Sequence, residues 1–219
     1  MRLDIYLTKY HNIQSRNKAQ ELIKSKKVLV DDKVIAKPSF LVEDNHTITI
    51  DQELFYVSRA AYKLKYFIEE NSIDISNNNA LDIGSSTGGF TQVLLLANVK
   101  SVTCVDVGSN QLHPSIKDDK RIIVKENTDI REFESTQKFD LVTCDVSFIS
   151  ILNIIEDINR LSLNKIIILY KPQFEVGREV KRDSKGMVLD NKAILECRDQ
   201  FILKTKELAW NFIKSEQSK

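Results

Sequence analysis

The chain has 219 residues, enough for one or two small domains, with 42% hydrophobic and 29% charged residues. No apolar run is long enough to span a bilayer, and the first ten residues, MRLDIYLTKY, lack the apolar core of a signal peptide. These features exclude membrane-spanning and secreted proteins and predict a folded cytoplasmic protein.

The cysteines and histidines give no sign of a disulfide framework or a metal site. Cys104, Cys144 and Cys197 show no C-x-x-C spacing and lie mostly in apolar runs, so we expect them to be reduced. The three histidines are isolated, and their spacing fits no pattern of metal ligands.

The net charge of +1 hides a local excess of basic residues at the start of the chain. Residues 1–40 hold nine lysines and arginines against four acids, a net charge of +5, so the remaining residues carry −4. One interpretation is an ordinary solvated surface, and the other is a surface that follows the phosphates of a nucleic acid. Under the second interpretation, the candidate RNA-binding residues are Arg2, Arg16, Lys18, Lys24 and Lys27.

The spacing of this basic segment predicts a small α+β domain. Ser15 is placed to cap a helix. The buried stripe of this helix is expected to be Ala19, Leu22 and Ile23, and a second, largely basic face contains Arg16, Gln20, Lys24 and Lys27. Two short strands follow in VLVDDKVI, and a third is expected at 47–50. This order resembles the S-four-type RNA-binding domain, which implies shape and phosphate contacts with folded RNA.

Residues 51–57 are predicted to be a linker, and Ser58 to cap the helix that follows, SRAAYKLKYFIEE. Lys63 borders the apolar stripe of this helix next to Phe67. The aliphatic stem of Lys63 is therefore expected to be anchored rather than extended into solvent.

The rest of the chain is organised around residues 80–97, ALDIGSSTGGFTQVLLLA. Gly84, Gly88 and Gly89 lie between a short apolar run and a helical pattern that begins near Phe90, which predicts the first strand, turn and helix of a doubly wound domain. The pattern D-x-G-x-x-x-G-G-F differs from the dinucleotide fingerprint and lacks a Walker lysine. Asp82, at the strand end, suits a ligand that carries a cationic amino group.

The second strand of this domain adds another acid. The run SVTCVDVG ends in Asp106, which is placed to accept hydrogen bonds from ribose hydroxyls. An acid at each of two strand ends around a glycine-rich loop resembles the S-adenosylmethionine site of class I methyltransferases.

Further strands are expected at 121–125, 139–144 and 165–170, with helical stretches such as 149–161 between them, so the sheet is parallel. Ligands of such sheets bind beyond the carboxyl ends of the strands. This rule singles out Asp82, Asp106, Asp129, Asp145 and Lys171. Asp145-Val146-Ser147-Phe148 lacks the (D/N)-P-P-aromatic signature of amino-directed methyltransferases. A cytosine C5 methyltransferase would need a thiolate nucleophile, but strand alternation points Cys144 away from the Asp145 side. The remaining acceptor that suits the site is a hydroxyl.

Seven stretches together resemble the TlyA (hemolysin A) family: MRLDIYL, SRNKAQELI, YVSRAAYKL, LDIGSSTGGFT, VDVGSNQL, DVSFIS and KPQFEVGRE. The resemblance implies an S-four-type RNA-binding domain at 1–55 and an FtsJ-like methyltransferase domain with a Rossmann-like class I sheet at 56–219. It implies S-adenosylmethionine-dependent 2′-O-methylation of a ribose, that of a cytidine, in ribosomal RNA. The expected partner is ribosomal RNA or a ribosomal subunit, with no membrane, and the expected state is a monomer.

The resemblance also implies the site residues. Members catalyse with a Lys-Asp-Lys-Glu tetrad, and the motifs match Lys63, Asp145 and Lys171 to its first three positions. The implied cofactor contacts are Asp82, Gly84, Gly88, Gly89, Phe90, Asp106 and Asp129, the last near the adenine. In the implied mechanism Lys171 accepts or polarises the 2′-hydroxyl proton, helped by burial and by Lys63, while Asp145 orients Lys171.

Two departures from the family pattern bear on activity. Ala60-Ala61 replaces the usual Gly-Gly, which favours the helix. The G-N-x-E-F stretch that carries the tetrad glutamate is absent after a helix expected at 193–213, so we expect a sheet without its last strands and greatly reduced methyl transfer. Glu175 is a conceivable substitute. The alternatives are a protein that binds RNA and cofactor without turnover and, less favoured by the sequence, a membrane-active hemolysin.

Overall fold

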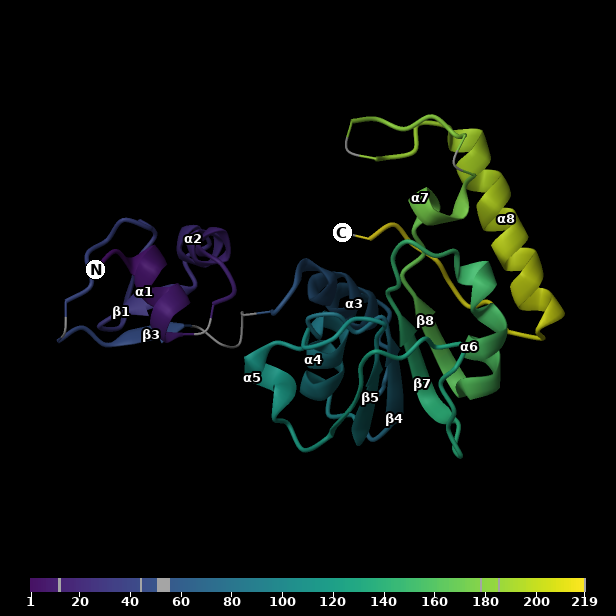
Figure 1. Ribbon diagram of the computed structural model, residues 1–219, viewed down its shortest axis with the longest axis horizontal. Coiled ribbons are helices and arrows are strands. Elements are labelled where there is room, and N and C mark those ends of the chain that lie inside the picture. Colours follow the sequence, from purple (N-terminus) through teal and green to yellow (C-terminus); the bar gives the residue numbers. More distant parts are fainter. Residues whose placement is uncertain (12, 44, 51–55, 178, 185, 219) are drawn as a thin grey trace. The chain divides into compact units, whose positions relative to one another are not determined.

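The computed structural model describes residues 1–219 except 12, 44, 51–55, 178, 185 and 219. The chain forms two compact units, Met1–Val57 and Ser58–Lys219, each with its own hydrophobic core (Figure 1). Most of the expected linker, 51–55, lies outside the described residues. Its last two residues, Tyr56 and Val57, are buried rather than exposed.

The N-terminal unit packs two helices against a small antiparallel sheet (Figure 1). Its elements are α1 (Leu3–Tyr10), α2 (Arg16–Lys24), β1 (Val28–Val30), β2 (Lys33–Val34) and β3 (Ile48–Ile50), with strand order β2-β1-β3. Ser15 caps α2 by accepting a hydrogen bond from the Lys18 amide at 3.2 Å, which confirms the predicted cap. The predicted stripe of α2 is also confirmed, because the residues buried from this helix are Ala19, Leu22 and Ile23.

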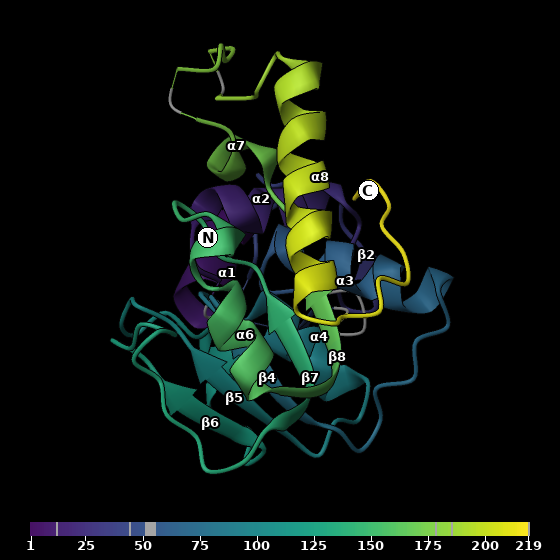
Figure 2. The same ribbon diagram turned by 90° about the vertical axis from the view of Figure 1, so that its right-hand side faces the viewer.

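The C-terminal unit contains a five-stranded parallel sheet, visible in Figure 2, which confirms the predicted doubly wound α/β class. The strand order is β6-β5-β4-β7-β8. The chain runs outwards from β4 through β5 to β6 and then crosses back to the other side of β4 for β7 and β8, so the strand order reverses between β4 and β7. The strands are β4 (Asn79–Ile83), β5 (Ser101–Val105), β6 (Ile122–Lys125), β7 (Phe139–Cys144) and β8 (Ser162–Ile168). Ligands of such sheets bind at this reversal point.

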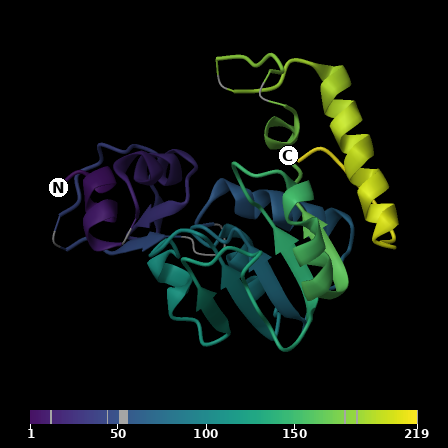
Figure 3. The same cartoon turned by 45° about the vertical axis from the view of Figure 1, so that its right-hand side comes forward.

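Helices cover both faces of this sheet. In Figures 2 and 3, α6 lies in front of the sheet, whereas α3 and α4 lie behind it. The helical elements are α3 (Arg59–Glu70), α4 (Gly89–Leu96), α5 (Pro114–Lys117), the 3₁₀ turn η2 (Ile151–Asn153), α6 (Ile155–Leu161), α7 (Pro172–Glu175) and α8 (Asn191–Glu207). Among the described residues, none of the helices has the length and apolar character needed to cross a membrane.

Three element boundaries differ from the sequence expectation. The helix expected at 149–161 is divided into η2 and α6, and β8 begins three residues before 165 and ends at Ile168. The helix expected at 193–213 ends at Glu207, because Ala209 adopts a left-handed φ of 56°. The turn brings Trp210 back to α6, where its Nε1 donates to Asn159 Oδ1 at 2.8 Å.

The glycine-rich loop after β4 is packed tightly against two other elements. Gly84 has a φ of +75°, and a Cβ there would lie 3.1 Å from the backbone oxygen of Asp145. A Cβ on Gly89 would overlap Ser58 Oγ and approach the Ala61 amide at the start of α3. The loop therefore needs glycine for contacts within the protein itself.

Gly84→Ala is expected to lower the free energy of unfolding by about 1–2 kcal/mol or more. The substitution would force an alanine into the left-handed backbone region and would bring its Cβ close to the Asp145 backbone. Urea denaturation followed by the fluorescence of Trp210, the single tryptophan, measures this in the C-terminal unit. Gly177→Ala is the matched control, since no atom lies within 4 Å of its Cβ position. Equal losses in the two variants would contradict the packing argument.

Candidate active site

The carboxyl ends of β7 and β8 bring an acid and a base together. Lys171 Nζ lies 2.6 Å from Asp145 Oδ1, and it donates a hydrogen bond to Ser147 Oγ at 2.9 Å. Both charged side chains are mostly buried, with 18% of Lys171 and 16% of Asp145 exposed. The pair is therefore partly shielded from water, and the Lys171 ammonium is held by the Asp145 carboxylate and the Ser147 hydroxyl.

Lys63 of α3 is the third member of this group. Burial raises the pKa of Asp145, whereas the hydrogen bond and charge of Lys171, and then the charge of Lys63, act in the opposite direction. Lys63 is thus close enough to act on the Asp145 carboxyl electrostatically. The structure pairs Asp145 with Lys171 directly, and Lys63 acts on the same carboxyl through its charge; sequence motifs assign these three residues to catalysis.

This group of charged residues is joined to the glycine-rich loop. The Asp145 amide donates to the carbonyl of Ile83, the last residue of β4, at 3.0 Å. Gly84 follows Ile83 and lies against the Asp145 carbonyl. Gly88, with a φ of 87°, occupies the N-cap position of α4. The loop and the catalytic strand end are therefore neighbours.

Asp106, at the end of β5, has the features expected of a ribose acceptor. Its Oδ2 accepts from the Ser86 amide of the glycine-rich loop at 2.8 Å, and its Oδ1 accepts from the Gly108 amide at 2.7 Å. Each carboxylate oxygen has a second lone pair, and the side chain is partly exposed. The carboxylate is thus oriented by two backbone amides, with acceptor capacity remaining.

Asp82 differs from the expectation of an acid that faces a ligand. Its carboxylate is fully buried beneath the loop and accepts from Thr91 Oγ1 at 2.6 Å and Thr143 Oγ1 at 2.9 Å. Burial raises its pKa to about 6, against the two hydroxyl hydrogen bonds. Phe90 is also a core residue in the first turn of α4, with 4% exposure. Both residues support the loop from inside.

Asp129 is also engaged within the protein. Both of its oxygens contact Arg131, with 2.6 Å between Asp129 Oδ2 and Arg131 Nη2. The hydrogen bonds from Arg131 lower the pKa of Asp129 to about 2. A contact of Asp129 with adenine, expected from the sequence, would have to share the carboxylate with Arg131.

Sequence reasoning missed an aromatic pair beside Lys171. Phe148 is 92% exposed and adopts a left-handed φ of 67°, a strained backbone for a bulky residue. Its ring centroid lies 5.2 Å from that of Phe174, and Lys171 Nζ lies 5.9 Å from the Phe174 centroid. The signal was an aromatic residue three positions after Asp145, which we set aside because prolines were missing.

Glu175, the residue considered as a substitute for the tetrad glutamate, binds two groups of the segment after β7. One of its carboxylate oxygens accepts from Ser150 Oγ at 2.6 Å and the other from the Ile151 amide at 3.1 Å. Glu175 therefore connects the loop after β8 to the loop after β7. It fixes the two segments that carry Lys171 and Asp145 relative to each other.

The cysteines offer no reactive group near this site. All three are free thiols, and Cys104 in β5 and Cys144 in β7 are buried. Burial raises the pKa of both thiols to about 12. Within the described part of the chain, no cluster of His, Cys, Asp and Glu has the arrangement of a metal site.

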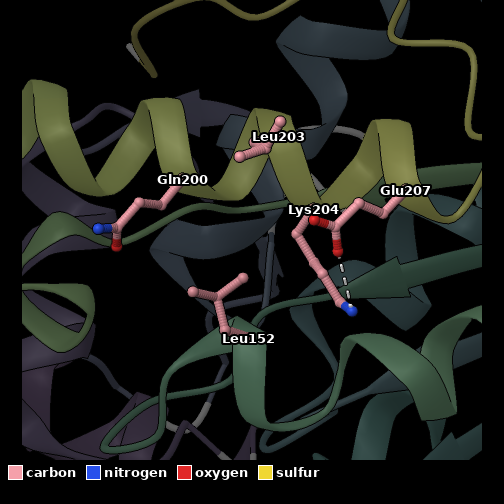
Figure 4. A pocket seen from close by; sticks show the side chains of 5 residues that line it. All are labelled: Leu152, Gln200, Leu203, Lys204 and Glu207. Atoms are coloured by element: carbon pink, nitrogen blue, oxygen red, sulfur yellow. Dashed lines mark ion pairs between the residues drawn. The ribbon is translucent and has the colours of Figure 1, made fainter.

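A hollow on the molecule lies between η2 and α8 and is separate from these residues. It is lined by Leu152, Gln200, Leu203, Lys204 and Glu207, and its charged groups pair with each other, with 3.3 Å between Lys204 Nζ and Glu207 Oε2 (Figure 4). None of the expected site residues lines this hollow.

In the N-terminal unit, the expected RNA-binding residues lie on or beside α1 and α2. Arg2 and Arg16 both pair with Asp4. Lys18 pairs with Glu21 at 3.4 Å, and Lys24 is exposed at the end of α2. The basic residues are therefore at the surface, and two of them share one buried acid.

Asp82→Asn is expected to remove a pH dependence of the unfolding free energy. The folded pKa of about 6 lies above the ordinary aspartate value of about 3.9, so this group's stabilising contribution is fully present below about pH 4. It is lost as the pH rises towards 6. Urea denaturation between these pH values should give a flatter profile for the variant. The exposed control Asp199→Asn should keep the wild-type slope, and coinciding Asp82→Asn and wild-type profiles would contradict this assignment.

Comparison with known proteins gives similarities over both units. A family model described as "FtsJ-like methyltransferase" matches residues 56–219, and one described as "S4 domain" matches residues 1–48. The chain is 46% identical to the 23S rRNA (cytidine-2′-O)-methyltransferase TlyA of Campylobacter jejuni, with 100% of this chain and 93% of that protein covered.

Two further proteins are similar over most of the chain. The 16S/23S rRNA (cytidine-2′-O)-methyltransferase TlyA of Mycobacterium tuberculosis is 38% identical, with 97% of this chain and 81% of that protein covered. A solved structure described as "Putative hemolysin from Streptococcus thermophilus" has a TM-score of 0.65 and 28% sequence identity. The match covers 95% of this chain and 78% of that protein's chain. The chain therefore belongs to the FtsJ-like methyltransferase family, in a form that carries an S4 domain before the methyltransferase unit.

Proposed function

We propose that the chain transfers a methyl group from S-adenosylmethionine to the 2′-hydroxyl of a ribose, that of a cytidine, in ribosomal RNA. The observation that carries this proposal is the buried ion pair of Lys171 and Asp145, with Lys63 beside it, next to the glycine-rich loop. The names of the relatives from C. jejuni and M. tuberculosis support the same reaction and nucleotide. The proposed substrate also implies a cytoplasmic protein.

The residues around the loop fit S-adenosylmethionine. Asp106 is an oriented carboxylate with lone pairs for the two ribose hydroxyls. Gly84 places backbone without a side chain between this acid and the catalytic group. Asp82 and Phe90 are buried and support the loop from the core. When bound, the cofactor supplies a methyl group made electrophilic by the sulfonium.

The catalytic residues act on the acceptor oxygen. We assign Lys171 to act on the 2′-hydroxyl: as the ammonium of its ion pair with Asp145 it polarises the O–H bond, and it accepts the proton only as the neutral amine, once its own proton has passed to Asp145 or to solvent. Lys63 adds positive charge where that oxygen becomes more negative, an effect that is strong in a partly dehydrated site. Asp145 fixes the position of Lys171 through the 2.6 Å ion pair, so the attacking oxygen can be aligned before the reaction.

The exposed aromatic pair suits the substrate side of this site. Phe148 presents nearly its whole ring to solvent beside the residues that act on the ribose. The unstacked bases of single-stranded loops and bulges in RNA stack on exposed aromatic rings. Phe148 is therefore assigned to the base of the target nucleotide.

Two other functions were open from the sequence. Binding of RNA and cofactor without turnover was one alternative, but the methyltransferase name of the C. jejuni relative favours turnover. The hemolysin interpretation takes support from the description of the S. thermophilus structure. Release of dye from anionic vesicles at low protein concentration would favour that interpretation over methyl transfer.

Methyl transfer is tested with tritiated S-adenosylmethionine and ribosomal subunits that lack 2′-O-methylation. We expect incorporation at one cytidine, which becomes resistant to alkaline cleavage. Lys171→Ala should lower the rate by about 10²-fold or more, as expected for loss of a proton-transfer group. Lys192→Ala removes an exposed lysine of α8 and should have no effect. Absence of wild-type incorporation into either subunit would overturn the proposed function.

Cofactor binding is tested separately by calorimetry with S-adenosylhomocysteine. Asp106→Ala should weaken binding by about tenfold, because the charge-assisted hydrogen bonds to the ribose can no longer form. Asp199→Ala, which removes an exposed acid of α8, should bind like the wild type. Tight binding of NAD with no binding of S-adenosylhomocysteine would contradict the cofactor assignment.

A further inference from the structure

A buried acid lies at the centre of the basic surface of the N-terminal unit. Asp4, in the first turn of α1, has no exposed surface. Its Oδ1 lies 3.0 Å from Arg2 Nε. Its Oδ2 accepts from Arg2 Nη2 at 3.0 Å, Arg16 Nε at 2.9 Å and Gln20 Nε2 at 2.8 Å. One carboxylate thus holds two guanidinium groups and an amide.

These bonds keep the buried carboxylate ionised. The hydrogen bond from Arg2, followed by those from Arg16 and Gln20, holds the pKa of Asp4 well below its usual range against the effect of burial. The arginines themselves remain at the surface, with 39% of Arg2 and 52% of Arg16 exposed. The cluster therefore presents two positive groups outwards and hides its negative group.

The backbone on both sides of the cluster is also fixed. Arg2 forms an isolated antiparallel bridge with Leu41, and the neighbouring Leu3 amide donates to the Phe40 carbonyl at 2.8 Å. Arg16 is the first residue of α2, directly after the capping residue Ser15. Neither arginine depends on a long flexible segment for its position.

The arrangement leaves guanidinium groups for a second acceptor. Asp4 engages Arg16 through Nε and Arg2 through Nε and Nη2; among the described residues no hydrogen bond occupies the two Nη groups of Arg16 or Nη1 of Arg2, so these donors can serve a further acceptor. Two guanidinium groups in one cluster repel each other unless an anion lies near them, and Asp4 offsets only one of the two charges. Phosphate matches the fork of donors on arginine and is the abundant anion of RNA. Gln20 and Lys24 continue from Arg16 at helical spacing along α2.

We propose that Arg2 and Arg16 form one preorganised binding site for an RNA phosphate, and that Asp4 is the positioning residue that holds the two guanidinium groups in place. This inference rests on the proposed action on ribosomal RNA. It assigns a favourable role in RNA binding to a residue whose own charge repels RNA. Fixing the arginines before binding reduces the ordering cost at the moment of association.

The proposal and a simple charge account give opposite expectations for Asp4→Asn. The substitution removes one negative charge from a basic surface, so long-range attraction alone would strengthen RNA binding. If Asp4 positions the arginines, binding becomes weaker by about tenfold, as for loss of one charge-assisted hydrogen bond. Filter binding of the full chain to transcribed large-subunit ribosomal RNA measures the difference. The slope of log affinity against log salt should fall by about one for each phosphate that the variant no longer neutralises.

Glu43→Gln is the matched control. Glu43 is an exposed acid of the same unit, and its removal changes the net charge by the same amount. We expect equal or stronger RNA binding for this variant. Weaker binding of Asp4→Asn together with unchanged Glu43→Gln supports the proposal, whereas equal affinities of the two variants overturn it.

A structural role of Asp4 alone is distinguished by kinetics and by a second variant. Asp4→Asn should raise KM for RNA and leave kcat and the affinity for S-adenosylhomocysteine unchanged; a fall in kcat alone would contradict the proposal. Arg16→Lys retains both Asp4 and the positive charge, but lysine has one nitrogen for two acceptors. It should lose affinity as Arg16→Ala does, and wild-type affinity of Arg16→Lys would overturn the proposal even if Asp4→Asn unfolds.

The two levels of inference fail in different ways. If the wild-type chain transfers no methyl group to ribosomal RNA, the proposed function fails. If the wild type binds and methylates RNA but Asp4→Asn binds as Glu43→Gln does, only the positioning role of Asp4 fails.

Discussion

The contact between the loop after β4 and the end of β7 determines how this site is built. Gly84 lies so close to the Asp145 carbonyl that a side chain would press against the backbone, and the Asp145 amide bonds to the last residue of β4. A shift of either segment would move the other. The expected cofactor side, which contains Asp106, and the proposed catalytic side, which contains Lys171, are therefore parts of one connected arrangement rather than two independent sites.

Residues that are far apart in the sequence lie close together at this site because the strands that carry them are parallel neighbours. A parallel sheet brings the carboxyl ends of its strands to one edge, so the sequence placed Asp106, Asp145 and Lys171 together without knowledge of side-chain contacts. Lys63 was placed there by its motif, and the charge it exerts on Asp145 agrees with that position. Periodicity also predicted the class of the fold and the buried stripe of α2, because both depend on local patterns of apolar residues.

Burial and partner choice were less accessible to sequence reasoning. Asp82 occupies a position typical of a ligand-binding acid, but Thr91 and Thr143, distant in sequence, enclose it in the core. Asp129 is engaged by Arg131, two residues away, and a pattern of residue types does not reveal which acids pair locally. Sequence reasoning counted Asp4 only as one of the four acids among nine basic residues of the first 40, although Asp4 contacts two of those basic residues, Arg2 and Arg16. These partners depend on side-chain direction, which strand and helix periods specify incompletely.

The buried thiols of β5 and β7 bear on the chemical selectivity of a methyl-transfer enzyme. A sulfonium methyl group is an electrophile, and a thiolate is a better nucleophile than a ribose hydroxyl. Cys144 directly precedes Asp145 in the chain, yet burial keeps it and Cys104 in the neutral thiol form. The same apolar core that supports the sheet thus holds two sulfur nucleophiles away from solvent in their less reactive form. It leaves the hydroxyl of a bound substrate as the acceptor that the site activates.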